Sequence, residues 1–207
     1  MRAAARGALS LVVAASLAGG AARAAAPAGT PEAIIHRTVD DAFAILKDGA
    51  LAGKEHRAER LAALRVVADR TFDWAEMARA SLGAPWRTLD AARRGRFVEV
   101  FKDVLAARYM DDINRFEGTE TVTVDGSARD GDDTIVKTTL VTASRERVPM
   151  DYRTRLAGER LTVVDISIEG VSLVNHYRKT FASALVNMTV DQLIERLSKQ
   201  LPAPSRK

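Results

Sequence analysis

The segment from Val163 to Phe181 changes its hydrophobic period at Gly170, and this change constrains the fold more than any other feature. Before the glycine, apolar residues alternate with polar ones as in a strand with one buried face; they are Val164, Ile166 and Ile168. After it, apolar residues recur at helical spacing; they are Val171, Val174, Tyr177, Phe181 and Leu185. The sequence therefore predicts a strand that leads directly into a helix, with an acid, a glycine and a small polar residue at the corner.

The chain before residue 120 has the periodicity of helices. Thr30 followed by Pro31 is typical of a helix start, and glycines at 49 and 53 end this first helix. The longest helix has a broad apolar stripe and is expected to face the core along its whole length. The predicted helices cover residues 30–49, 55–69, 73–82 and 88–109.

The second half of the chain changes to strands and then returns to helices. Short, turn-rich links between the strands favour antiparallel hairpins. A final helix is expected from Thr189, because Thr189 and Gln192 have the spacing of a capping box. The predicted strands cover residues 121–124, 134–142, 148–156 and 161–168.

Helices segregated onto an antiparallel sheet define an α+β domain. We expect a curved four-stranded antiparallel sheet, packed by N-terminal and C-terminal helices and enclosing an apolar cavity. Cavities of this kind are common small-molecule sites. The fold alone does not decide the function.

The first 26 residues have the pattern of a secretory signal peptide. Arg2 and Arg6 precede a short apolar core, and Ala22-Arg23-Ala24 is a small-x-small cleavage site. Cleavage is expected after residue 24 or 26, which would export the rest of the chain to the periplasm. We expect a single domain over residues 27–201 and a loose tail over 202–207.

The net charge of the chain depends on whether the first 26 residues are counted. They contain three arginines and no acid, so the net charge of +4 falls to +1 without them. A nearly neutral domain lacks the broad positive field that binds a phosphate backbone, so no nucleic-acid partner is expected. The chain has no cysteine, which excludes disulfides, thiol catalysis and thiolate metal sites.

Several motifs together resemble the MlaC-like periplasmic phospholipid carriers, also called the toluene-tolerance auxiliary family. The corner supplies the strongest likeness, through Asp165 and residues 169–173, followed by Tyr177-Arg178. The last helix adds residues 191–194, and the middle region adds residues 96–101 with their aromatic and acidic pattern. The likeness extends over nearly the whole chain after the presequence.

The resemblance implies a soluble shuttle that carries phospholipid between two membranes. Its expected partners are phospholipid, an inner-membrane ABC lipid transporter complex and an outer-membrane lipoprotein complex. We expect a monomer with no cofactor, the bound phospholipid being cargo. Burial of a methylene is worth about 0.8 kcal/mol, so one long acyl chain in water costs on the order of 10 kcal/mol. Such a carrier needs a deep apolar pocket and a partner that unloads it.

The candidate lipid-binding residues are the inward positions of the sheet, the facing stripe of the longest helix and the residues at either end. Ordinary core packing gives the same pattern, because periodicity does not separate a packed core from a cavity wall. The candidates are Phe72, Met77, Phe97, Phe101, Val104, Leu105, Val148, Met150, Tyr152, Val164, Ile166, Ile168, Val171 and Val174.

The charged residues allow two interpretations. Glu169 is expected to cap or brace the following helix with the support of Ser172, because a carboxylate is favoured near a helix N-terminus; contact with a lipid headgroup is the alternative. Two groups of arginines are interpreted as solvated faces or as contacts for an anionic partner or membrane surface; they are Arg87, Arg93, Arg94 and Arg96, and Arg147, Arg153 and Arg155.

Other functions remain open at this point. Asp165, Glu169 and Tyr177 lie near one corner, as acid–base residues of a small-molecule hydrolase or isomerase would. However, no histidine has metal-ligand spacing to another, and the common nucleophile and phosphate-loop motifs are missing, so no catalytic or metal-binding residue is assigned. The cargo could also be a hopanoid or another lipid. An adaptor that binds a protein but no lipid is a further alternative.

Overall fold

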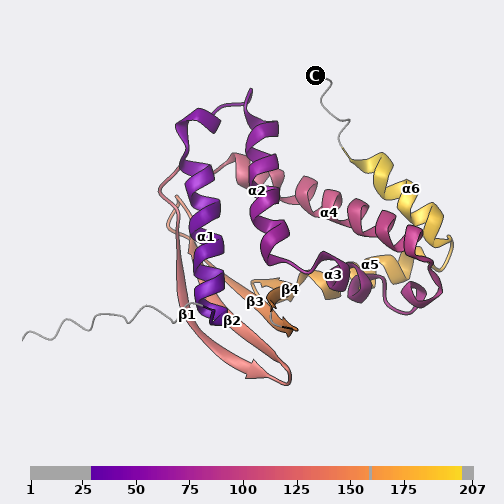
Figure 1. The fold of residues 1–207 in the computed structure, drawn as a ribbon. Helices are drawn as coiled ribbons and strands as arrows, with labels where there is room; N and C mark the ends of the chain where they lie inside the picture. Colours follow the sequence, from indigo (N-terminus) through magenta and orange to yellow (C-terminus); the bar gives the residue numbers. More distant parts are fainter. Residues whose placement is uncertain (1–28, 159, 202–207) are drawn as a thin grey trace, which may run out of the picture.

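The computed structural model of the chain describes residues 29–158 and 160–201. The expected signal peptide and tail lie outside these residues. The helices pack on and beside an antiparallel sheet (Figure 1), so the predicted α+β class is confirmed. The helices are α1 (Pro31–Lys47), α2 (Arg57–Thr71), α3 (Trp74–Leu82), α4 (Ala91–Asn114), α5 (Leu173–Ala184) and α6 (Val190–Gln200), with short 3-10 turns η1 (Gly49–Leu51) and η2 (Ala84–Thr88).

The sheet has five strands in the order β1-β2-β3-β4-β5, and each antiparallel pair consists of neighbours in the sequence. The predicted hairpins are therefore confirmed, and the sheet has one strand more than expected. The strands are β1 (Thr121–Asp130), β2 (Asp133–Val141), β3 (Arg147–Ala157), β4 (Arg160–Ile168) and β5 (Val171–Ser172).

Local caps account for several helix starts. The hydroxyl of Thr30 accepts a hydrogen bond from the backbone N–H of Ala33, as expected for an N-cap. The predicted capping box of α6 is also present: Thr189 and Gln192 each accept from the other's backbone N–H. These two starts follow from the local sequence because both partners of each bond lie within one helical turn.

Strand β1 ends later in the chain than the sequence predicted. The sequence predicted that the strand ends at Val124 and that residues 125–133 form the link, but β1 continues to Asp130. A register shift between Val124 and Gly126 inserts one extra residue and lets pairing with β2 resume. The polar residues after the shift are mostly exposed, and an edge strand tolerates them because it has one free side.

At the corner after β4, two predictions were wrong: the residue at which the helix begins and the acid that braces it. Val171 was predicted to begin the helix, but it pairs with Ile168 in the short strand β5, and α5 begins at Leu173. Glu169 has a positive φ of 51° and its side chain is exposed. The acid that braces α5 is instead Asp165, whose carboxylate accepts from the hydroxyl of Ser172 and from the backbone N–H of Val174 at 3.1 Å.

Two apolar clusters form the core. The larger one lies among α3, α4, α5 and α6, where the rings of Phe97, Phe101, Tyr177 and Phe181 pack edge-on, tilted or stacked at 5.5–6.3 Å. We call it the helical cluster. The smaller one lies where α1 crosses the sheet (Figure 1); we call it the sheet cluster, and its buried members are Ile35, Val136, Tyr152 and Val163.

Candidate apolar binding site

The two clusters meet at Phe72 and Ile166, which pack against both. Phe72 follows α2 directly and forms a parallel bridge with Val163 of β4. The next residue extends this pairing, because the backbone N–H of Asp73 donates to the carbonyl of Val163 at 2.9 Å. The chain between α2 and α3 therefore attaches the helical part of the molecule to the sheet at one defined point.

One face of the sheet presents apolar side chains toward α1. The strand register places this face in cross-strand rows: Val136, Tyr152 and Ile166 in the first row, the polar Thr138 with Met150 and Ile168 in the second, and Leu140 and Val148 in the third. The side chains become less buried from the first row to the third. The first row belongs to the sheet cluster or packs against it, whereas Leu140 and Val148 are only half-buried and pack against neither cluster.

The two N-terminal helices also have apolar side chains that are only half-buried. The stripe of α1 begins in the sheet cluster with Ile35 and Val39 and continues toward its C-terminus with Phe43 and Leu46, which are half-buried and belong to neither cluster. On α2, Leu61 and Leu64 are also half-buried outside both clusters, and α1 packs along α2. This part of the domain thus has apolar side chains from two helices and the sheet that the protein itself covers incompletely.

The structure distributes the candidate lipid-binding residues over three environments. Met77, Phe97, Phe101, Leu105 and Val174 are buried in the helical cluster, and Phe72, Val104, Ile166 and Ile168 pack against it. Tyr152 lies in the sheet cluster with Met150 against it. The three candidates in neither cluster are Val148, Val164 and Val171.

Two of those three occupy unexpected positions. Val171 is 57% exposed in β5, so it does not close an end of the core as predicted. Val164 is buried, but strict alternation fails there: Asp165 pairs with Arg153 while Val163 pairs with Thr154, which makes Val164 the extra residue of a bulge. The bulge turns Val163 rather than Val164 into the sheet cluster.

Residues that the sequence-based candidate list missed include Ile35, Val136, Val163 and Leu140. Ile35 was recognisable as part of the first helical stripe, but nothing in the sequence indicates that this helix crosses the sheet. Val136 and Leu140 alternate along β2, which gives a period-two signal. Val163 gives no such signal because the bulge interrupts the period.

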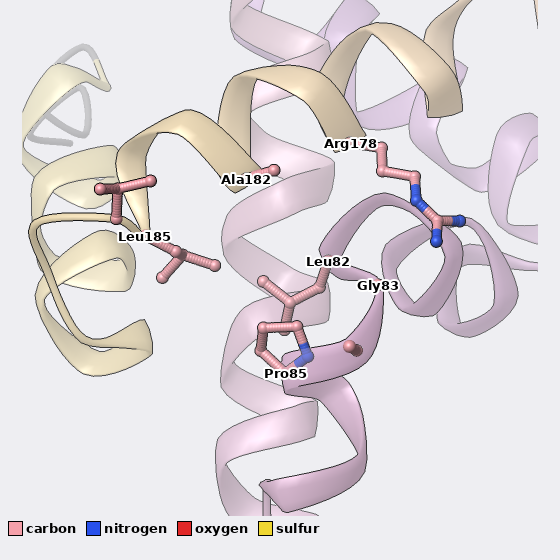
Figure 2. A pocket seen from close by; sticks show the side chains of 8 residues that line it. Leu82, Gly83, Pro85, Arg178, Ala182 and Leu185 are labelled. Carbon is pink, nitrogen blue, oxygen red and sulfur yellow. The ribbon is translucent and has the colours of Figure 1, made fainter.

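Two clefts are lined by none of the candidate lipid-binding residues. The first, of about 350 Å³, lies between the α3–η2 corner and α5. Figure 2 shows Ala182 of α5 and Leu185, which follows this helix, facing Leu82 and Pro85 across the cleft, with Arg178 beside Gly83. The second, of about 410 Å³, lies at the C-terminal end of α1 and is lined by Leu46, Ala52, Gly53, Lys54, Arg57, Arg60 and Phe116.

Two of the three arginines on strand β3, Arg153 and Arg155, form ion pairs within the protein, whereas Arg147 is exposed. Arg155 binds the buried carboxylate of Asp133 through Nε at 2.6 Å and also binds Glu76 of α3 at 2.9 Å, while Arg153 binds Asp133 at 3.1 Å and Asp130 at 2.7 Å. Hydrogen bonding from Arg155, followed by that from Arg153, holds the pKa of Asp133 below its ordinary value. This network joins β2 and β3 to α3.

The arginines near the start of α4 also have internal contacts. Arg93 lies 3.3 Å from Asp191 of α6, and the guanidinium of Arg94 lies over the ring of Trp86 at 5.5 Å. Arg93 and Arg94 therefore have contacts within the protein, whereas Arg87 and Arg96 of the same group are exposed.

The residues considered for catalysis are dispersed. The Asp165 carboxylate braces the start of α5, and Tyr177 is buried in the helical cluster, where burial raises its pKa. His36 and His56 form exposed pairs with Asp40 and Glu59. Among the described residues, no group of three or more His, Cys, Asp or Glu side chains could hold a metal ion. Within the same residues, every helix is too short or too polar to span a membrane.

The fold and the site define an α+β domain whose antiparallel sheet presents a partly covered apolar face to its helices. The chain belongs to the MlaC family: the sequence model of the MlaC protein matches residues 36–199. The family identified from the motifs is thus confirmed.

A solved structure has a similar fold. It is the phospholipid-binding protein from Ralstonia solanacearum, determined in complex with a phospholipid. It superimposes with a TM-score of 0.70 over 81% of this chain and 94% of that chain, at 24% sequence identity. A comparison of the sequence with curated proteins gives no match.

Proposed function

We propose that this protein is a periplasmic lipid carrier that binds the acyl chains of a phospholipid against the partly covered apolar face. The observation that carries the proposal is that apolar side chains on the sheet and on both N-terminal helices are only half-buried; they are Leu140 and Val148 of the sheet, and Phe43, Leu46 and Leu61 of α1 and α2. A packed core would cover these side chains, whereas a carrier uses its cargo to cover them. Membership in the MlaC family and the phospholipid bound by the Ralstonia protein of similar fold support this assignment.

The energetics set what the carrier must do. Each methylene removed from water contributes about 0.8 kcal/mol, so two long chains are retained by roughly 20 kcal/mol against free solution. A lipid bound this strongly leaves at a useful rate only where another apolar environment receives it. We propose that the acceptors are an inner-membrane ABC lipid transporter complex and an outer-membrane lipoprotein complex, the partners that membership in the MlaC family implies. The exported domain would comprise residues 27–201 and act as a monomer.

The binding site would open where the structure is least packed. The third row and the ends of α1 and α2 offer surface that a chain can contact without displacing core side chains. In contrast, Phe97 and Phe101 are fully buried in the helical cluster, and a lipid that reached them would have to separate α4 from α5. We therefore assign first contact to Val148 and Met150 of the candidate residues, and place Phe97 and Phe101 behind them.

An enzymatic function has less support. The acid, hydroxyl and tyrosine of the β4–α5 corner are used in bracing and packing, which leaves no base beside a nucleophile there. A hopanoid or another elongated lipid is the alternative cargo, because an apolar face of this kind does not select between cargoes by itself.

Extraction of the purified protein with organic solvent tests the proposal. A carrier should release a stoichiometric amount of lipid, and mass spectrometry of the extract would separate phospholipid from hopanoid. Recovery of an empty, folded protein that also fails to take lipid from vesicles would contradict the carrier function. Release of hydrolysed lipid, with turnover on added ester, would favour an enzyme instead.

A further inference from the structure

The cleft between α3, η2 and α5 has an apolar lining with a single charge. Figure 2 shows the end of α3 and η2 on one side of this cleft and α5 on the other. Among the described residues that line it, only Arg178 is charged. We call this cleft the α3–α5 groove. Its apolar lining residues are Leu82, Ala84, Pro85, Ala182, Leu185 and Val186.

The guanidinium of Arg178 lies against the turn that ends α3 and has no ion pair. Its Nε and Nη2 atoms lie 3.7 Å from the position that a Cβ on Gly83 would take. Helix α5 and the turn η2 contain no acid, and Glu76 of α3 is already paired with Arg79 and Arg155. Within residues 29–158 and 160–201, no carboxylate forms an ion pair with Arg178. This cation is therefore available to a carboxylate of a partner.

The apolar walls of the groove are open to solvent. Val186 is 77% exposed, the largest value for a bulky apolar side chain among the described residues, and Ala182 is exposed beside it. The groove has a volume of about 350 Å³, near the lower end of the range for small-ligand sites. This size suits one or two apolar side chains of a partner protein better than a whole phospholipid.

The charge and the apolar surface lie along one face of α5. Ala182 and Leu185 follow Arg178 by four and seven residues, so all three are on the same side of the helix, as Figure 2 shows. At the helical rise of 1.5 Å per residue, Arg178 and Leu185 are separated by about 10 Å along the helix axis. A partner must therefore present a carboxylate and an apolar side chain about this far apart, which an extended segment does within about three residues.

We infer that the α3–α5 groove is a docking site for an acidic, apolar segment of a partner protein. The segment places an apolar side chain between Pro85 and Leu185 and pairs a carboxylate with Arg178. Arginine suits this role because its planar guanidinium binds carboxylates by two parallel charge-assisted hydrogen bonds. The inference goes beyond the proposed lipid carrier function, because none of the candidate lipid-binding residues lines the groove.

The test uses short peptides as probes and needs no lipid. Isotope-labelled protein is titrated with acetyl-Asp-Leu-Ala-Leu-Leu-amide and with the same peptide carrying Asn in place of Asp, and the NMR shifts of backbone amides report binding. Shifts are expected at residues 82–84 and 182–186. The acidic peptide should bind at least about threefold more tightly than the neutral one, because only its carboxylate forms an ion pair with Arg178.

A charge exchange tests the ion pair itself. Arg178→Glu should reverse the preference, so that acetyl-Lys-Leu-Ala-Leu-Leu-amide binds more tightly than the acidic peptide. The matched control is Lys179→Glu, which changes the net charge equally at the next residue, exposed and outside the groove, and should keep the wild-type preference. Glutamate is a good helix former, so both variants should fold, and unchanged shifts in the rest of the spectrum check this.

A second substitution tests the apolar part of the groove. Ala182→Leu fills the groove with a larger side chain, so it should weaken binding of both the acidic and the neutral peptide at least about threefold. Ser183→Leu adds a leucine at the neighbouring exposed residue outside the groove and should leave both affinities unchanged. Equal affinities in Ala182→Leu and the wild type would show that no side chain of the peptide enters the groove.

The remaining outcomes would also overturn the inference. These are equal binding of the acidic and neutral peptides by the wild type, a preference that survives Arg178→Glu, and no binding of any peptide at millimolar concentration. Sodium decanoate is titrated alone, and larger shifts of the same amides than the peptides cause would identify a lipid site. Shifts in the groove that change with protein concentration alone would identify a second copy of this chain as the occupant. Lipid extraction tests the carrier function separately, so the two can fail independently.

Discussion

The hydroxyl of Ser172 donates a hydrogen bond to the carboxylate of Asp165 across the corner where β4 gives way to α5. The same hydroxyl caps α5 by accepting from the backbone N–H of Asn175 at 3.0 Å. The second carboxylate oxygen of Asp165 accepts from the N–H of Val174. One buried acid and one hydroxyl therefore satisfy two of the free N–H groups at the start of this helix.

Replacement of Asp165 should destabilise the domain. Asp165→Ala removes two charge-assisted hydrogen bonds and leaves the N–H of Val174 without its acceptor in a buried site, so we expect the free energy of unfolding to fall by about 2–3 kcal/mol. Urea denaturation measures it. The control is Glu169→Ala at the exposed acid of the same corner, which should change stability by less than about 0.5 kcal/mol. A larger effect at Glu169 would show that the corner is braced differently.

The free energy of unfolding should decrease at acid pH because Asp133 and Glu76 then lose their ion pairs. The folded-state pKa of Asp133 lies below its ordinary value of 3.8, and that of Glu76 lies below 4.5 because of Arg79 and Arg155. The unfolded chain therefore binds protons first as the pH falls, and stability present at neutral pH is lost below about pH 5 and down through the folded-state pKa values.

Asp133→Asn should reduce that dependence. Because the arginines are partly exposed and screened, we expect a loss of about 1–2 kcal/mol at pH 7 and a flatter profile between pH 5 and pH 2. Unfolding curves at a series of pH values measure both quantities. Asp132→Asn, at the exposed neighbour, should reproduce the wild-type profile. An unchanged profile in Asp133→Asn would assign the acid sensitivity to other carboxylates.

Two glycines should respond to alanine with opposite signs. Gly83 ends α3 with φ 73° and ψ −137°, a conformation that side chains disfavour, so Gly83→Ala should cost about 1–3 kcal/mol. Gly95 lies exposed inside α4 with open space where a Cβ would be, so Gly95→Ala should stabilise by about 0.5–1 kcal/mol. Thermal unfolding of both variants measures the difference, and the same sign for both would contradict the backbone assignment.

Local signals in the sequence predicted the parts of the fold that depend on neighbours in the chain. The caps at Thr30 and Thr189 and the order of helices and strands are of this kind, since each rests on contacts or periods within a few residues. Motifs spread over the chain supplied the family, which the composition did not indicate.

Features that depend on distant residues were not predictable in the same way. The bulge at Val164 is a shift in the register between β3 and β4, and the hydrophobic period of one strand alone does not indicate it. Val171 is apolar and at helical spacing, yet pairing with Ile168 makes it a strand residue. Phe72 was recognised as apolar, but its position between two clusters arises from a bridge to Val163, which is 91 residues further along the chain.

Val148 and Val171 provide the sharpest test of where the cargo lies, because the sequence placed both at the site and the structure separates them. Val148→Glu puts a charge in the third row of the apolar face, where desolvation by an acyl chain is costly, so we expect at least a roughly tenfold loss of co-purified lipid. The half-buried position packs against neither cluster, so the fold should persist. Val171→Glu changes a side chain that is 57% exposed in β5 and should leave lipid content unchanged. Extraction and quantification of lipid per folded protein compares the two; equal lipid content in Val148→Glu and the wild type would remove the third row from the site.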